Sequence, residues 1–465
     1  MRKNRAGRRI LALLLALLLA LAVTACGGTA AKNEEGGAAQ ATPPDNGEEG
    51  DKTAEAEGQN AQGRYREETV WEMKLADNAQ AGLSDEGDFV FLNCPTSQIL
   101  VSGDGGYTWE NRADEAFTAF TEENYAVAAA CSGDGRIAMV TMHREAEDGE
   151  EYTYRLYLYD TDRTVREIPF TPPEPGSRPA ALLFDESGRL YVSTSGSYAV
   201  FEVSVSDGSA RKLADVPGMV QTMDCTGSTL MWATGSTVYF YDLETGSLTE
   251  DPMLNDFIRE TYGNMEWFGG GFHALPFLGG DDVVYLAGEQ GLHRHVIGGS
   301  TMEQLIEGSL SSFGDPSHSI MAMQRNGESG FLALFGDGKI VMFTYDASAA
   351  CVPAGEVTVY SLYADDNIKQ TISTFQAAWP DLYVHYEVGM EESGVTREDA
   401  LKKLNTRLLA GEGPDVLILD GMDIAAYAEK GVLADLSGLA EEIGQKEGLF
   451  ENLLQPFYQG ERLCA

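Results

Sequence analysis

The chain has 465 residues, of which 73 are Asp or Glu and 32 are Lys or Arg, so its formal net charge is −41. Nucleic-acid binding needs a positive surface that releases counterions from the phosphates, and this charge therefore excludes a nucleic-acid partner. The six cysteines lie far apart and form no CxxC pair, which predicts free thiols instead of a disulfide framework. The length allows about three domains.

Residues 1–26 have the pattern of a secretory signal. Five basic residues within the first nine precede an apolar run over 10–23, which is shorter than the roughly 20 residues of a membrane-spanning helix. The run is followed by Thr24-Ala25-Cys26, which resembles the lipobox of bacterial lipoproteins, whose cysteine is acylated. The resemblance implies a protein that acylated Cys26 anchors to the cell membrane on its extracytoplasmic face. An ordinary signal peptide with a chance cysteine is the alternative.

The segment that follows is polar and acidic. Residues 27–64 contain no Val, Ile, Leu, Met or aromatic residue. Such a segment cannot bury enough apolar surface to offset the entropy that ordering would cost. We therefore predict a disordered acidic linker over residues 27–66.

A repeat of short apolar strands and Gly/Asp/Asn turns covers residues 67–352. Its first strands include SGDGRIAMV, DESGRLYVS and CTGSTLMWA, and equivalent positions 90, 139, 191, 231, 285 and 332 are 40–54 residues apart. This period is typical of blades of about four strands that close radially. The repeat predicts a β-propeller of six blades, with seven left open, in preference to an array of β-sandwiches.

Two motifs in this region suggest structural roles. Residues 102–109, SGDGGYTW, match the Asp-box of sialidase-like propellers, a turn motif whose Trp109 packs between sheets. A sialidase also needs an arginine cluster and a Tyr–Glu nucleophile pair, and neither stands out here, so we expect no enzyme activity and no cofactor. His293 and His295 share one face of a strand without a visible third ligand, which predicts a satisfied surface pair and no metal site.

The pattern changes at Glu356. Three apolar segments, residues 356–363, 382–388 and 415–420, alternate with segments of helical periodicity. Trp379 closes the apolar face of the first helix, and we assign it to the helix core. Alternating strands and helices imply a parallel, doubly wound sheet. The expected fold class is thus multidomain: a β-propeller followed by an α/β lobe.

Three phrases carry a second resemblance: VTVYSLYADD, FQAAWPDLYVHYE and LNTRLLAGEGPDVLILDGMDIAAYAEKGVLADLSGL. Together they resemble the N-terminal lobe of the extracellular solute-binding proteins of ABC importers, in particular the sugar-binding group. The resemblance implies that residues 356–465 form one incomplete lobe, that the ligand is a small molecule such as a sugar, and that an ABC permease is the partner. Because a second lobe would follow residue 465, we expect the chain to be a fragment.

Ligand contacts are expected where strands of an open parallel sheet end. By resemblance, the loop after the first strand offers Tyr363 and Asp365, and the loop after the third offers Asp420 and Met422. An aromatic face stacks on a sugar ring and carboxylates accept hydroxyl hydrogen bonds. Alternatively, the two aspartates only cap helices. A second hypothesis for the whole protein is a surface scaffold or sensor whose propeller binds a protein or glycan.

Overall fold

The protein is described by a computed structural model in which the chain forms two compact units, residues 64–346 and a unit that includes residues 347–465. The predicted signal, Cys26 and nearly all of the predicted linker lie outside the described residues. In the part of the chain that the structure describes, no helix has the length and apolar character needed to cross a membrane. The described residues are 63–73, 79–83, 89–93, 97–144, 152–265, 267–268, 271–280, 282–316, 318–327, 329–350, 353–390, 394–419, 421–446 and 451–464.

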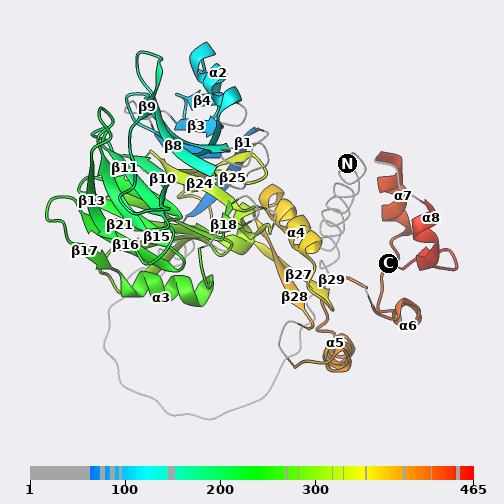
Figure 1. Ribbon diagram of the computed structural model, residues 1–465. Coiled ribbons are helices and arrows are strands. Elements are labelled where there is room, and N and C mark those ends of the chain that lie inside the picture. The colour runs from blue at the N-terminus through cyan, green and yellow to red at the C-terminus, as the bar shows by residue number, and fades with distance from the viewer. Residues whose placement is uncertain are drawn as a thin grey trace, which may run out of the picture. The chain divides into compact units, whose positions relative to one another are not determined.

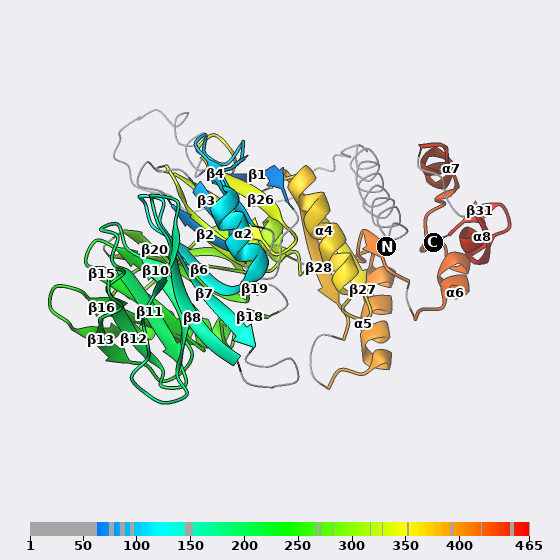
Figure 2. The same cartoon turned by 45° about the horizontal axis from the view of Figure 1, so that its top comes forward.

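The larger unit is built from six antiparallel sheets, here called blades 1 to 6 (Figures 1 and 2). Blade 1 contains β2 (Ala79–Leu83), β3 (Phe89–Asn93), β4 (Gln98–Ser102) and β5 (Glu110–Asn111). Blade 2 contains β6 (Tyr125–Cys131), β7 (Ile137–Arg144), β8 (Tyr152–Tyr159) and β9 (Val165–Ile168). Blade 3 contains β10 (Arg178–Phe184), β11 (Leu190–Ser195), β12 (Ala199–Val203) and β13 (Ala210–Asp215).

The remaining three blades follow the same plan. Blade 4 contains β14 (Thr222–Thr226), β15 (Thr229–Thr234), β16 (Thr237–Asp242) and β17 (Leu248–Glu250). Blade 5 contains β20 (Ala274–Gly280), β21 (Val283–Gly288), β22 (Gly291–Val296) and β23 (Met302–Glu307). Blade 6 contains β24 (Ile320–Asn326), β25 (Gly330–Phe335), β26 (Lys339–Asp346) and β1 (Arg64–Glu72), and a short hairpin, β18 (Trp267–Phe268) and β19 (Gly271–Phe272), extends it beyond β24.

The first strands of the blades form a closed ring. β2 lies beside β6, and the succession continues through β10, β14, β20 and β24, which lies beside β2 again. The unit is therefore a six-bladed β-propeller, which confirms the preferred blade number and excludes the seventh blade. The six marker positions of the repeat all fall on the second strand of a blade, β3, β7, β11, β15, β21 or β25.

The ring is closed by strands from opposite ends of the propeller sequence. β1 pairs antiparallel with β26, with Arg64 opposite Asp346 and Glu72 opposite Lys339. In Figure 1 the blue β1 accordingly lies among the yellow-green strands of blade 6. This strand starts at Arg64, inside the segment predicted as linker, so the predicted boundary at residue 66 is slightly too late.

Apolar layers between adjacent blades hold the propeller together. Between blades 2 and 3 the layer includes Val140, Leu156, Val192 and Phe201, all of them buried. Because each sheet packs on both faces, apolar residues are not confined to alternate positions of the second strands, and all six residues of β25 are buried. This double burial explains why the strands are visible in the sequence as short apolar runs.

Two helices interrupt the strand pattern and were not predicted. α2 (Glu115–Glu123) follows blade 1, and α3 (Pro252–Thr261) follows blade 4. Each begins at an aspartate, Asp114 or Asp251, whose side chain accepts a hydrogen bond from a backbone N–H of the first turn. The buried face of α2 is narrow, with Phe117 as its apolar anchor, so its helical period is weak in the sequence.

The smaller unit contains a parallel sheet of three strands in the order β28-β27-β29. The strands are β27 (Gly355–Ser361), β28 (Leu382–Val388) and β29 (Val416–Leu417), and their connections contain α4 (Asp366–Ala378) and α5 (Arg397–Ala410). α4 lies along β28, as Figure 2 shows. β29 is shorter than the predicted strand over 415–420. Trp379 is the C-cap of α4 and is 52% exposed, so its assignment to the helix core is wrong.

The rest of this unit is mostly helical. α6 (Ile424–Glu429) follows β29, and Gly431 comes just after its C-cap with a φ of 68°. α7 (Ser437–Lys446), α8 (Glu451–Leu454) and a small hairpin of β30 (Tyr458–Gln459) and β31 (Arg462–Leu463) complete the described chain. Leu436 N–H donates to the Leu463 carbonyl, which ties the hairpin to the start of α7.

Candidate functional site

The predicted ligand loops lie at the carboxyl ends of β27 and β29 and meet there. A Cβ atom added to Gly421 would lie 3.5 Å from Cε2 of Tyr363, so the backbone after β29 runs against the tyrosine ring. Gly421 has a φ of 70°, a conformation in which glycine is favoured. Met422, half-buried, comes next in this loop. Asp420 lies outside the described residues. The structure therefore brings together Tyr363 and the loop that contains Met422.

The backbone that carries Tyr363 is fixed by a small hydrogen-bond network. The buried Ser361 hydroxyl donates to the Tyr363 carbonyl at 2.6 Å. Tyr386 of β28 lies 2.6 Å from the Ser361 oxygen, and its hydroxyl donates there because the serine proton is already used. The Tyr363 side chain remains 43% exposed. The result is an accessible aromatic ring on a well-supported backbone.

Asp365 is engaged by the helix that follows it. Its Oδ1 accepts from the N–H of Asn367 at 2.7 Å and of Ile368 at 3.4 Å, which makes it the N-cap of α4. The Asn367 side chain donates to the same oxygen, and these hydrogen bonds lower the pKa of Asp365. The capping role that the sequence also allowed is thus observed, and a ligand contact by Asp365 stays a prediction. The cap of α6 is Asp423, which accepts from Ala426 N–H at 3.1 Å.

Sequence reasoning missed a cation at this edge. Arg397, the first residue of α5, donates to the carbonyl of Gly421 and so links the start of α5 to the loop after β29. A helix that follows a parallel strand begins at the carboxyl edge of the sheet, so its first residues face the same loops. The position of Arg397 at the start of this helix could therefore have identified it from the sequence. Because an arginine supplies several donors, the site combines an aromatic face with a cation.

The Asp-box forms the predicted turn. Asp104 accepts from Thr108 through its hydroxyl at 2.6 Å and its N–H at 2.9 Å, and from Tyr107 N–H at 3.0 Å. These hydrogen bonds, that of the Thr108 hydroxyl first, lower the pKa of Asp104 to about 2. Trp109 Nε1 donates to the Gly106 carbonyl at 2.9 Å, and its half-buried ring packs on the apolar layer between blades 1 and 6. The packing of Trp109 between sheets is confirmed.

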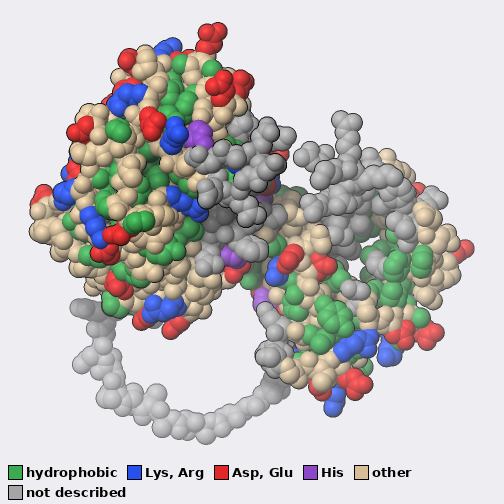
Figure 3. All heavy atoms as spheres, viewed as in Figure 1, with side chains coloured by type: hydrophobic (Ala, Val, Ile, Leu, Met, Phe, Trp, Pro, Cys, Tyr) green, Lys and Arg blue, Asp and Glu red, His purple; other side chains and the backbone are tan. Residues whose placement is uncertain are grey.

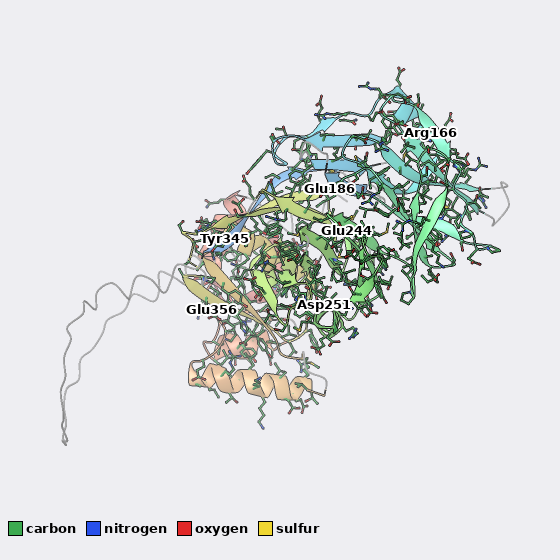
Figure 4. All side chains as sticks on the ribbon, turned by 90° about the vertical axis from the view of Figure 1, so that its left-hand side faces the viewer. Arg166, Glu186, Glu244, Asp251, Tyr345 and Glu356 are labelled. Carbon is green, nitrogen blue, oxygen red and sulfur yellow. The ribbon has the colours of Figure 1, made fainter. Side chains whose placement is uncertain are left out.

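The two histidines of β22 are buried, which corrects the prediction of a surface pair. His295 donates from Nε2 to Oδ2 of Asp251 at 2.9 Å, and its Nδ1 lies 2.8 Å from the Thr301 carbonyl. Gly298 N–H donates to the same carboxylate, which Figure 4 places in the propeller. His293 packs against Phe257 at a ring distance of 4.9 Å. Across the described ranges, no group of three or more His, Cys, Asp or Glu side chains is arranged to hold a metal ion.

The described cysteines are Cys131, Cys225 and Cys464. Cys225 is the most perturbed, because burial raises the pKa of its thiol to about 12. A thiol with a raised pKa is a poor nucleophile, since the thiolate is the reactive form. Cys225 is therefore a packing residue.

Comparison with known proteins gives likenesses of fold only. No protein-family model and no curated protein sequence matches the chain. Similar solved structures include a virginiamycin B lyase from Staphylococcus aureus (13% identity, 60% of this chain and 99% of that chain, TM-score 0.37). A gluconolactonase from Xanthomonas campestris shares 10% identity over 61% of this chain and 90% of that chain, with a TM-score of 0.40.

A third likeness is to an extracellular domain from B. thetaiotaomicron, in a protein described as a hybrid two-component system (13% identity, 56% of this chain and 32% of that chain, TM-score 0.34). The proteins with similar propellers include a lyase and a lactonase. Our expectation of no enzyme activity, which was based on the propeller region, is therefore wrong. The chain is a six-bladed β-propeller joined to a unit with a parallel α/β sheet.

Proposed function

We propose that the protein is a lipid-anchored, extracytoplasmic solute-binding component of an ABC importer, with a carbohydrate as its ligand. The observation that carries the proposal is the exposed Tyr363 ring beside Gly421, at the carboxyl edge of three parallel strands. Ligands of open parallel sheets bind at this edge. The sequence phrases that resemble sugar-binding proteins of ABC importers include both loops.

The chemistry of this edge suits a sugar. The Tyr363 ring offers an apolar face to the C–H groups of a pyranose, and the Arg397 guanidinium supplies donors for hydroxyl oxygens. Asp420 would add an acceptor, and Met422 an adaptable apolar contact. A permease partner follows from the resemblance, and in the sequence the propeller lies between Cys26 and the binding unit.

Ligand binding is tested by calorimetry of the complete protein against a panel of oligosaccharides. We expect one class of sugar to bind, and Tyr363→Ala and Asp420→Ala each to weaken it more than tenfold without lowering the melting temperature. Trp379→Ala is the matched control, because this exposed tryptophan lies at the opposite end of α4. Equal affinity in the Tyr363 and Trp379 variants would contradict the site. Failure of the whole panel would favour the scaffold or sensor hypothesis.

The lipid anchor is tested separately by cell fractionation. Cys26→Ser should leave an unprocessed protein or release the protein from the membrane fraction, because the serine cannot carry a thioether-linked lipid. A processed protein of unchanged mass that stays in the membrane fraction would refute the role of Cys26. This test does not depend on the identity of the ligand.

A further inference from the structure

A pocket of about 370 Å³ lies on blade 3 of the propeller, far in sequence from the site proposed above. One wall is the connection from β9 to β10, with Pro173, Glu174, Pro175 and Ser177. The volume is within the range of small-molecule sites, which begins near 300 Å³. All the lining residues belong to the propeller unit, so the pocket is complete within it.

The opposite wall consists of β12, β13 and the turn before them. Phe201 and Ala199 of β12 lie opposite Lys212 and Asp215 of β13 in the antiparallel register. Since directly paired residues project from the same face of a sheet, two apolar and two charged side chains stand side by side on this wall. Ala199 and Phe201 are buried in the layer between blades 2 and 3, so Lys212 and Asp215 form the exposed part of this wall.

Local sequence keeps the two walls apart by a fixed amount. The connection contains Pro172-Pro173-Glu174-Pro175, and each proline fixes its φ, so this segment is stiff. Gly176, at the end of this connection, lies against Gly196 in the turn between β11 and β12. Gly196 has a φ of 97°, and a Cβ atom added to it would lie only 3.1 Å from the Gly176 carbonyl oxygen. Because Gly196 has no side chain, the turn and the connection can pack closely against each other. The pocket is preformed, which lowers the entropic cost of binding.

The pocket contains a polar atom that lacks a partner. The hydroxyl oxygen of Ser177 is buried and has no hydrogen-bond partner among the described residues. Leaving a buried hydroxyl unpaired is unfavourable, and a hydrogen bond to a ligand hydroxyl would remove this cost. Ser197 lines the same pocket and adds a second hydroxyl.

The charges of the lining favour a neutral ligand. Glu174 and Asp215 are acceptors and would repel an anion, whereas Lys212, which pairs with Asp215, would repel a cation. The propeller face in Figure 3 similarly mixes basic and acidic side chains and shows no field of one sign. Donors and acceptors of both kinds beside the exposed Pro173 and Pro175 match a molecule with many hydroxyl groups and exposed C–H faces.

We infer that this pocket binds a neutral saccharide of one or two rings, at a site distinct from the carboxyl edge of the parallel sheet. Ser177 and Ser197 meet ligand hydroxyls, the carboxylates accept from them, and the two exposed prolines contact the C–H faces. This inference does not rest on the function proposed for the smaller unit. It assigns a second binding site to the propeller itself.

The test combines calorimetry with hydrogen–deuterium exchange of the full chain, using a panel of neutral mono- and disaccharides. We expect a binder that slows exchange of peptides covering residues 170–178 and 210–216. Ser177→Ala and Asp215→Asn should each weaken this binding at least fivefold. Ser187→Ala, at an exposed turn of the same blade, is the matched control and should leave it unchanged.

The variants also separate this site from the one in the smaller unit. Binding that Tyr363→Ala abolishes and Ser177→Ala leaves intact belongs to the parallel sheet and overturns the inference. No protection of the 170–178 peptide at millimolar saccharide overturns it as well. If Ser177→Ala raises the melting temperature without changing binding, its hydroxyl is only an unpaired buried group and the pocket assignment fails.

Discussion

Asp224 of blade 4 hydrogen-bonds to blade 5, and its titration makes the stability of the propeller depend on pH. Its carboxylate accepts from Leu278 N–H of blade 5 at 2.7 Å and from Cys225 N–H at 2.8 Å. Loss of surrounding water nevertheless raises the pKa of Asp224 to about 6. The folded state therefore holds the proton more tightly than the unfolded state. Stability should fall as pH rises from about 4 to about 6, and the full penalty should persist above that range.

We predict that Asp224→Asn stabilises the propeller at pH 8 by about 1–2 kcal/mol and changes little at pH 4. The amide removes the buried charge and keeps one oxygen for Leu278, but it loses the second hydrogen bond. Denaturant unfolding at both pH values measures this. Asp242→Asn in the same blade should act in the opposite direction, because hydrogen bonds from Thr245 lower the pKa of Asp242. A pH-independent effect of Asp224→Asn would contradict the assignment.

Asp251 joins a helix start to a buried histidine. It accepts from Leu254 N–H at 3.0 Å as the cap of α3, and from His295 and Gly298. Asp251→Ala should lower the free energy of unfolding by about 3–5 kcal/mol, because it removes the cap of α3 and leaves the buried donors of His295 and Gly298 without their acceptor. Asp256→Ala on the same helix breaks only the exposed pair with Arg259 and should cost less than about 1 kcal/mol. Similar losses in the two variants would contradict a special role for Asp251.

At the scale of elements, the Asp-box turn is expected to matter for packing. Trp109→Ala should cost about 2–3 kcal/mol, less than the about 3–5 kcal/mol of a fully buried ring, because the side chain is half-buried. Thermal unfolding measures the loss. Saccharide binding by the smaller unit should persist wherever the variant still folds. A stable variant that loses only ligand binding would show that Trp109 contacts a ligand.

The elements differ in how far the sequence predicts them. The second strand of each blade is buried on both faces, so a short apolar run marks it, and the marker residues from Val90 to Leu332 lie on the strands expected. The pairing of β1 could not be predicted, because Arg64–Glu72 alternates little and its partner lies at the far end of the unit. α3 could have been predicted, because Asp251-Pro252 is a typical helix start and Leu254 and Ile258 lie four residues apart on one face.

The same limits apply to the candidate sites. Tyr363 and Met422 were predicted by resemblance to solute-binding proteins, and the general rule that ligands bind at the carboxyl edge of a parallel sheet agrees with their loops. Arg397 was missed because its contact is with a backbone carbonyl, which no side-chain pattern reveals. The pocket beside Ser177 depends on how a proline-rich connection crosses to the next blade. No spacing in the sequence encodes that crossing.

At the scale of the molecule, one strand decides whether the ring is complete. A chain that begins at Gly63 keeps every described element and should unfold like the longer chain. A chain that begins at residue 74 lacks β1 and exposes the edge of β26, where Ile340, Val341 and Phe343 are buried. We expect it to aggregate, as unpaired apolar edges do. Size-exclusion chromatography and thermal unfolding compare the two. A monomeric, equally stable shorter chain would contradict the closure.

The pairing of β1 with β26 also determines the order in which the chain can fold. The Arg66–Asp346 contact joins residues 280 positions apart, and closing so long a loop costs about 5 kcal/mol of chain entropy. β1 is synthesised first among the propeller strands, yet its partner emerges last. Ring closure must therefore wait until all six blades have left the ribosome, and non-local pairing of this kind is slow. Until then the chain carries an open apolar edge, so its most aggregation-prone period ends when β26 emerges, while the smaller unit is still being synthesised.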